Sequence, residues 1–199
     1  MQKIAIFGGT FNPIHNGHVH LAQQFSARIG FDRVIFIPTH VPPHKQAPEL
    51  LSSQHRLNMC QLAAQECGYE VSNIEVNRAG PSYTADTLHQ LKLLYPHDEL
   101  YLITGADMFL TLNDWRNPKQ IYALATICAA PRSKQGYAEL SAYAKKLEQY
   151  GAHSIIENIE YLPVSSTMVR AAVKNGESIA HLVPHTVADY IEKNKLYME

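Results

Sequence analysis

Short apolar runs recur along the chain and are separated by stretches with helical periodicity. The runs lie at residues 3–7, 33–37, 70–76, 99–103, 125–130 and 153–162. Apolar runs of this length, alternating with amphipathic helices, are typical of a parallel sheet, because each parallel connection crosses over through a helix. We therefore expect an α/β fold with a Rossmann-like, doubly wound and mainly parallel sheet.

Capping residues mark the helices between these runs. Ser52 or Ser53 can begin a helix that runs through Cys67, and Gly68 follows as a stop signal. Similar patterns predict helices at 17–29, 83–95 and 137–150. Ligands of a doubly wound sheet bind beyond the carboxyl ends of the strands, so the loops at those ends form the candidate site. These loops are residues 8–18, 38–45, 80–84, 105–107 and 131–132.

Length and composition restrict the class of protein. A chain of 199 residues suits one domain, so we expect a single unit over 1–199, with C-terminal helices from about residue 165 completing the site. The formal net charge of −1 argues against nonspecific binding to nucleic acid. No stretch approaches the roughly 20 apolar residues that span a bilayer, and the first residues lack a signal-peptide pattern. We expect a cytoplasmic protein that does not enter membranes, with its three cysteines reduced and packed.

The segment GGTFNPIHNGH, residues 8–18, follows the first apolar run and combines glycines with two histidines. It lacks the third glycine of the dinucleotide fingerprint and the GK[ST] of a phosphate loop, which disfavours a dehydrogenase and a P-loop kinase. Histidines at the positive start of a helix suit an anion. A metal is the alternative, although the sequence has no CxxC or His-Glu-x-x-His to supply a third ligand. A capped turn with surface histidines is the purely structural alternative.

The segment VSSTMVR, residues 164–170, is a second candidate for phosphate binding. Hydroxyls and amides at a helix start, with Arg170 one turn in, can bind phosphate oxygens. Taken alone, such a segment is usually only a helix cap.

Together these two segments resemble the nucleotidyltransferase superfamily that carries HxGH and ISSTxxR motifs and is related to class I aminoacyl-tRNA synthetases. Within it, GPSYTADTL at 80–88, GAD at 105–107 and Trp115 resemble the bacterial nicotinate mononucleotide adenylyltransferases. Val164 stands where isoleucine is usual, and Arg132 follows Pro131 where many relatives have arginine before proline. The resemblance implies an enzyme of NAD biosynthesis that joins ATP and nicotinate mononucleotide, giving nicotinate adenine dinucleotide and pyrophosphate.

The same resemblance implies roles for individual residues. It implies that His15, His18, Lys45 and Arg170 make the catalytic contacts to the ATP phosphates. ATP binding falls to Gly8, Gly9, Thr10, Phe11, Gly105, Asp107, Ser165, Ser166 and Thr167. Nicotinate mononucleotide binding falls to Tyr83, Thr84, Trp115, Arg132 and His44. Mg²⁺ is expected to arrive bound to ATP, without a dedicated protein site.

Three alternatives stay open at this point. Trp115 is either a stacking surface for a pyridine ring or an anchor of the core. The enzyme is either the adenylyltransferase named above or a sibling that uses another phosphorylated acceptor. The third alternative is that the chain is not an enzyme but a protein that binds a nucleotide without turnover. The oligomeric state is also open, and a homo-oligomer is compatible with the sequence.

Overall fold

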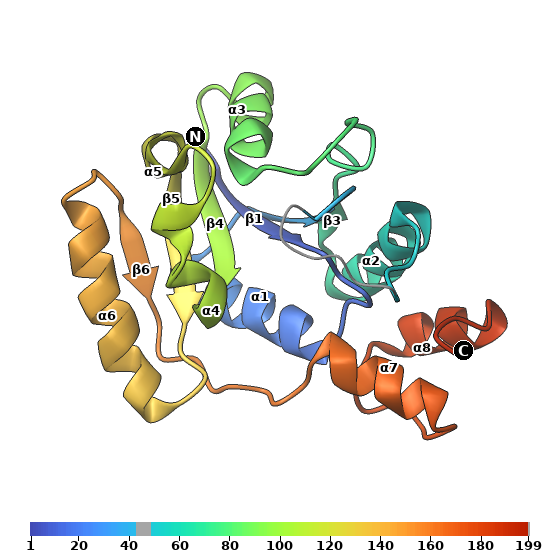
Figure 1. The fold of residues 1–199 in the computed structure, drawn as a ribbon. Helices are drawn as coiled ribbons and strands as arrows, with labels where there is room; N and C mark the ends of the chain where they lie inside the picture. The colour runs from blue at the N-terminus through green and yellow to red at the C-terminus, as the bar shows by residue number, and fades with distance from the viewer. Residues whose placement is uncertain (43–48, 199) are drawn as a thin grey trace. The chain divides into compact units, whose positions relative to one another are not determined.

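The computed structural model describes residues 1–42 and 49–198, in which strands and helices alternate (Figure 1). The strands are β1 (Lys3–Gly9), β2 (Arg33–Pro38), β3 (Glu70–Val71), β4 (Glu99–Gly105), β5 (Ala125–Ala130) and β6 (Ser154–Ile156). The helices are α1 (Asn16–Ile29), α2 (Ser53–Cys67), α3 (Thr84–Leu94), α4 (Ala106–Phe109), α5 (Pro118–Leu124), α6 (Lys134–Glu148), α7 (Ser166–Lys174) and α8 (His185–Lys193), with a 3₁₀ turn, η1, at Leu112–Asp114.

The strands form one sheet in the order β3-β2-β1-β4-β5-β6. The neighbours from β1 to β6 run parallel, with Lys3 beside Glu99, Leu100 beside Ala125 and Ile127 beside Ser154. The order reverses between β1 and β4, which is the topological switch point where doubly wound sheets bind their ligands. The predicted doubly wound α/β fold is confirmed.

Two strands are shorter than their apolar runs predict. β3 ends at Val71: the Ser72 N–H makes one more bond to the Phe36 oxygen of β2, and the Ser72 hydroxyl then accepts from the Ile74 N–H in a local turn. β6 is an edge strand that pairs with β5 alone, so its pairing stops where β5 stops. The apolar character of residues 72–76 and 157–162 is therefore not strand character.

Helix boundaries follow the capping signals. Ser52 accepts a hydrogen bond from the His55 N–H at the start of α2, and Gly68 ends that helix with φ of 69°. Glycine suits this left-handed position because it has no Cβ. The helix predicted at 137–150 begins earlier, because Ser133 caps it by accepting from the Gly136 N–H. Helices α4 and α5 were not predicted, although Pro118 at the start of α5 is a recognised signal.

The chain divides into two compact units, each built from three segments. The first unit comprises Met1–Gly8, Leu21–Ile35 and Ser82–Tyr161, and the second comprises Gly9–His20, Phe36–Pro81 and Leu162–Glu199. The expectation of a single domain over 1–199 stays a prediction. Most candidate acceptor residues belong to the first unit, whereas the histidines and the VSST segment belong to the second.

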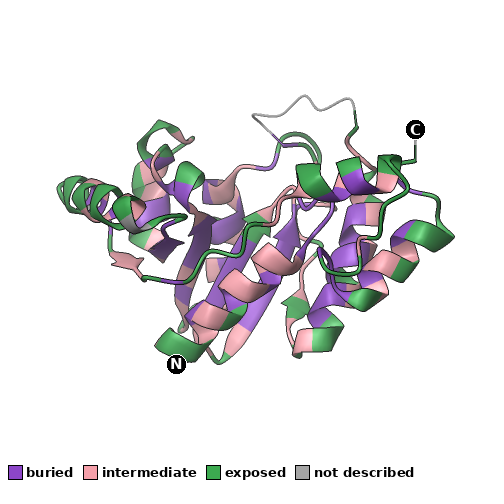
Figure 2. Ribbon diagram, turned by 90° about the horizontal axis from the view of Figure 1, so that it is seen from below, coloured by how far each residue is buried: buried purple, intermediate pink, exposed green. Residues whose placement is uncertain are grey.

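The buried core is shared between the sheet and its helices (Figure 2): β1, β2, β4 and β5 are largely buried, and the helices supply the other large share of its apolar side chains. Cys60 and Cys128 are buried within it and Cys67 is half-buried, and all three are reduced cysteines outside any disulfide, as the sequence predicts. Burial raises the pKa of Cys128 to about 12, so this thiol stays protonated and acts as an apolar packing group. Within 1–42 and 49–198, no helix has the length and apolarity needed to cross a membrane.

Candidate active site

The two glycines at the end of β1 serve different purposes. A Cβ built on Gly9 would lie 3.0 Å from the ring of Phe11, so any other residue would press against that ring. A Cβ on Gly8 would meet nothing within 4 Å, which leaves open space beside its backbone. Phe11 itself has φ of 47° and is 2% exposed. Its ring is therefore a fixed wall of the loop, and Gly8 is the position where a ligand can approach.

His15 and His18 form a stacked pair. Their ring centroids lie 3.6 Å apart with 28° between the ring planes, and the edge of the Phe11 ring supports His18 at 5.0 Å. The backbone N–H of His15 donates to Nδ1 of His18 over 3.3 Å. Because Nδ1 accepts, the neutral His18 ring carries its proton on Nε2. The loop thus holds a histidine donor at the positive start of α1.

Gly17 allows this stacked arrangement. A Cβ at Gly17 would lie 3.1 Å from the His15 ring and 3.3 Å from the Val164 oxygen. The neighbouring Asn16 ties the start of α1 to the C-terminal segment, because its N–H donates to the Leu182 oxygen and its side-chain amide donates to the His181 oxygen. Glycine between the histidines therefore favours this close packing, and it is not there for an unusual backbone angle.

The VSST segment lies against the first loop within the second unit. Ser165 caps α7 by accepting from the Met168 N–H over 3.2 Å. Ser166 donates its hydroxyl to the Pro13 oxygen over 2.9 Å. The side chains of both serines therefore have structural partners, whereas exposed Thr167 lines a cavity. The two motifs are in direct contact through the hydrogen bond of Ser166 to Pro13.

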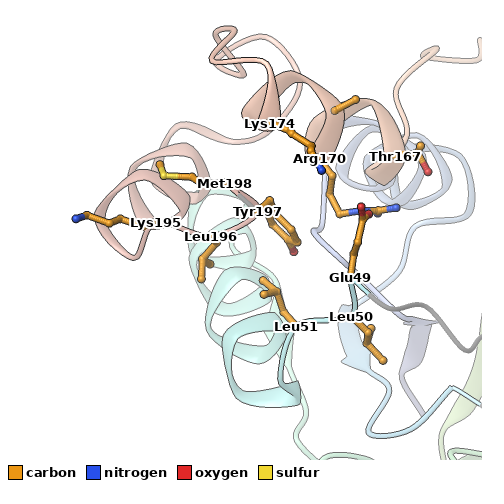
Figure 3. Close-up of a pocket in the computed structure, with 11 residues that line it drawn as sticks. Glu49, Leu50, Leu51, Thr167, Arg170, Lys174, Lys195, Leu196, Tyr197 and Met198 are labelled. Atoms are coloured by element: carbon orange, nitrogen blue, oxygen red, sulfur yellow. The ribbon is translucent and has the colours of Figure 1, made fainter.

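Arg170 faces the same cavity and is held at two points. Its Nη1 donates to the Asn12 oxygen over 2.8 Å, and its Nε donates to Glu49 Oε2 over 3.0 Å. The cavity has a volume of about 520 Å³, and Lys174 and Tyr197 also line it (Figure 3). Thr167, Arg170 and Lys174 project from one side of α7, so two of the three side chains carry positive charge into this space.

Arg56 is a buried residue that sequence reasoning missed. Its guanidinium is fully buried and donates to the oxygens of Thr10, His40 and Leu51 over 2.7, 3.0 and 3.1 Å. Burial lowers its pKa, although arginine remains charged at neutral pH. A signal was present in the sequence, because Arg56 occupies the same helical face as the apolar Met59 and Cys60.

His44 and Lys45 lie outside the described residues. Arg56 binds backbone on both sides of the interval 43–48, at His40 and at Leu51. The roles predicted for His44 and Lys45 stay predictions.

The first unit holds the aromatic candidates. Tyr83 precedes α3, and the Arg116 guanidinium lies 4.4 Å from the centroid of its ring. Thr84 begins the helix, and no side chain caps this start. Trp115 is half-buried, and its indole N–H donates to the Thr111 hydroxyl over 3.3 Å. Trp115 is therefore not enclosed in the core, so its ring can offer a surface to a ligand.

Arg132 and Asp107, for which the resemblance implies separate ligands, pair with each other. Arg132 Nη2 lies 2.9 Å from Asp107 Oδ2, and both side chains are more than half exposed. Asp107 stands in the first turn of α4, two residues after Gly105. Exposed ion pairs contribute little to stability, so this pair can open at small cost.

No group of three or more His, Cys, Asp or Glu side chains that could hold a metal lies within 1–42 and 49–198. The expectation that magnesium arrives bound to ATP stays a prediction.

Known proteins share both the sequence and the fold. The model of the cytidylyltransferase-like family matches residues 6–172. A relative from Carboxydothermus hydrogenoformans, described as a "probable nicotinate-nucleotide adenylyltransferase", is 42% identical over 98% of each chain. One from Dehalococcoides mccartyi with the same description is 41% identical over 98% of this chain and 97% of its own.

A solved structure with the same fold is the Plasmodium falciparum nicotinic acid mononucleotide adenylyltransferase complexed with NaAD. It has a TM-score of 0.79 and 19% identity, and the match covers 99% of this chain and 98% of that one. The same Plasmodium enzyme complexed with APC gives a TM-score of 0.77 at 18% identity, with the same coverage. At such identities the structures establish the fold, while the full-length sequence relatives establish the family. The chain therefore belongs to the nicotinate-nucleotide adenylyltransferases of the cytidylyltransferase-like family.

Proposed function

We propose that this nicotinate-nucleotide adenylyltransferase uses ATP and nicotinate mononucleotide as its substrates. An oxygen of the mononucleotide's phosphate attacks the α-phosphorus of ATP and forms the new P–O bond. The bond from that phosphorus to the oxygen bridging to the β-phosphate breaks, and its electron pair leaves with pyrophosphate. The reaction needs no protein nucleophile, so the protein's task is to position two polyanions and stabilise the developing charge.

The stacked histidine pair is the observation that carries this proposal. Negative charge grows on the oxygens around the α-phosphorus as the new bond forms. His18 supplies an Nε2–H donor at the positive end of α1, and its tautomer is fixed by the His15 N–H. A donor that is already oriented stabilises this charge without rearranging during the reaction.

The cavity beside α7 supports the placement of the triphosphate tail. Thr167, Arg170 and Lys174 line it together, which brings a hydroxyl and two cations to one space. The start of α7 at Ser165 and Ser166 adds backbone amides, and Lys45 is proposed as a further phosphate ligand. Open space beside Gly8 leaves room for the nucleotide along the loop of Gly9, Thr10 and Phe11. Magnesium, when bound, neutralises charge on the ATP phosphates.

The acceptor is proposed to bind to the first unit. The start of α3 at Tyr83 and Thr84 suits the carboxylate of a nicotinate ring, because helix amides favour an anion. The half-buried indole of Trp115 offers a face for that ring. Arg132 is proposed to release Asp107 and bind the mononucleotide's phosphate instead. Asp107, together with Gly105, is then proposed to contact the ATP ribose or the metal bound to ATP. His44 is assigned to the acceptor by resemblance alone.

A pyrophosphate-release assay tests the substrates. The purified protein is mixed with Mg²⁺, ATP and either nicotinate or nicotinamide mononucleotide. Parallel reactions contain phosphopantetheine with ATP or glycerol phosphate with CTP. We expect release with nicotinate mononucleotide and a higher kcat/KM than with the amide. No release with nicotinate mononucleotide, or higher kcat/KM with any other pair, would overturn the proposal.

A further inference from the structure

Asn12 connects four parts of the second unit. Its side-chain oxygen accepts from the Leu51 N–H over 3.2 Å, and its side-chain nitrogen donates to the Glu49 oxygen over 2.9 Å. Its backbone oxygen accepts from Arg170 Nη1 over 2.8 Å. Its fourth partner is Tyr197, whose hydroxyl lies 2.9 Å from Asn12 Oδ1. Asn12 is 5% exposed, so water has little access to replace these partners.

The partners of Asn12 determine which group donates to which. The Leu51 N–H can only donate, so the atom beside it is the amide oxygen. The Glu49 carbonyl can only accept, so the atom beside it is the amide nitrogen. Because Tyr197 meets the amide oxygen, its hydroxyl is the donor. Burial raises the pKa of Tyr197 well above its ordinary value, so this donor keeps its proton at neutral pH.

The backbone around Tyr197 adopts a costly conformation. Lys195 and Tyr197 have φ of 51° and 63°, in the left-handed region that residues with a Cβ rarely adopt. Such angles persist where the surrounding contacts specify them. Here the tyrosine ring lies over the cavity beside Arg170 and Glu49 (Figure 3), and its hydroxyl meets Asn12.

We propose that Tyr197 is a positioning residue for ATP, which acts through Asn12 to hold the first loop and Arg170 in the geometry that binds the triphosphate. The Tyr197 ring lines the cavity, and in this scheme its hydroxyl bonds Asn12 rather than a substrate. Its hydroxyl fixes the Asn12 amide, and the Asn12 backbone oxygen then fixes the Arg170 guanidinium. The inference rests on the proposed use of ATP and extends the site to a residue near the end of the described chain.

The test replaces Tyr197 with phenylalanine, which removes the hydroxyl and keeps the ring. Losing one oriented hydrogen bond should raise the KM for ATP about tenfold and leave the KM for nicotinate mononucleotide within about twofold. Titration with α,β-methylene-ATP should show the same loss of affinity without turnover.

Tyr190→Phe is the matched control. The Tyr190 hydroxyl also bonds within the second unit, but its partners are His55 and Asn58 on α2, away from the loop. We expect Tyr190→Phe to lower Tm and leave the KM for ATP unchanged. If Tyr197→Phe behaves in the same way, Tyr197 is merely structural and the inference is wrong.

A double mutant tests whether the effect passes through Asn12. In an Asn12→Ala background, Tyr197→Phe should produce no further rise in the KM for ATP, because the connecting residue is already gone. Effects of the two substitutions on the KM for ATP that multiply independently would contradict the inference.

The proposed substrates and the positioning role of Tyr197 can be rejected separately. If the wild-type protein is inactive with nicotinate mononucleotide but Tyr197→Phe still weakens binding of the ATP analogue, only the substrate assignment is wrong. An active protein in which Tyr197→Phe changes nothing would reject the positioning role only.

Discussion

The loop of the second unit and the acceptor residues of the first unit are built in opposite ways. In the loop, Asn12 and His15 are buried, and buried Arg56 holds the loop because its guanidinium donates to three backbone oxygens, one of them that of Thr10. Among the acceptor residues, Arg132 and Asp107 form an exposed ion pair and Trp115 is half-buried. One region is held by buried hydrogen bonds, whereas the other uses partners that a ligand can replace.

This difference matches the two tasks of an adenylyltransferase. Charge develops around the ATP phosphates during the reaction, and donors that are already fixed stabilise it without rearrangement. The acceptor must be recognised and the product released, so exposed contacts that exchange at small cost suit that side. Substitutions of the buried residues that hold the loop should therefore change stability and ATP use together, whereas those at the acceptor residues should change acceptor binding alone.

The largest expected effect is on the stability of the second unit. Arg56→Met removes three buried hydrogen bonds to backbone oxygens and should lower the free energy of unfolding by about 4 kcal/mol. Urea unfolding measures this loss. Arg56→Lys keeps a cation but loses the forked geometry, so it should fall between the wild type and Arg56→Met. An Arg56→Met protein as stable as the wild type would contradict the account of a tightly held loop.

The next effect concerns acceptor binding alone. Arg132→Ala should raise the KM for nicotinate mononucleotide about tenfold, because a charge-assisted contact to its phosphate is lost. The exposed pair with Asp107 contributes little to folding, so Tm should hardly change. Steady-state kinetics in both substrates, together with thermal melting, check the two parts. Asp107→Asn breaks the same ion pair and should not raise the KM for nicotinate mononucleotide. A rise as large as that of Arg132→Ala would show that the ion pair itself matters.

The smallest effect compares equivalent helix caps in the two units. Ser165 caps α7 and Ser133 caps α6, each by accepting a backbone N–H over 3.2 Å. Replacing either serine with alanine should cost about 1 kcal/mol of unfolding free energy. Only Ser165→Ala should also raise the KM for ATP, since α7 carries Arg170. If both variants raised the KM for ATP equally, the claim that only the second unit positions ATP would be wrong.

Sequence reasoning succeeded where local signals determine structure. The cap at Ser52, the left-handed glycine at Gly68 and the alternation of apolar runs predicted most strands and longer helices correctly. It overestimated β3 and β6, because the extent of a strand depends on its neighbours in the sheet and not only on its own apolarity.

The candidate site was predicted in part. The motif residues His15, His18, Ser166 and Arg170 do lie in one unit, and residue spacing and resemblance sufficed to find them. The supporting contacts were missed because they join residues far apart: Arg56 to Thr10 across 46 positions and Tyr197 to Asn12 across 185. No local pattern reports such pairings. The ion pair of Arg132 with Asp107 was missed for the same reason.

The most direct test of the central claim is the turnover of His18→Ala measured beside that of His20→Ala. Both histidines lie in the first turns of α1, but the His15 N–H and the stacked ring orient only His18. His18→Ala should lose about a hundredfold in kcat while its thermal unfolding stays close to that of the wild type. His20→Ala should retain the wild-type kcat. A His18→Ala protein with full turnover would contradict the claim that this histidine stabilises the charge developing on the α-phosphate.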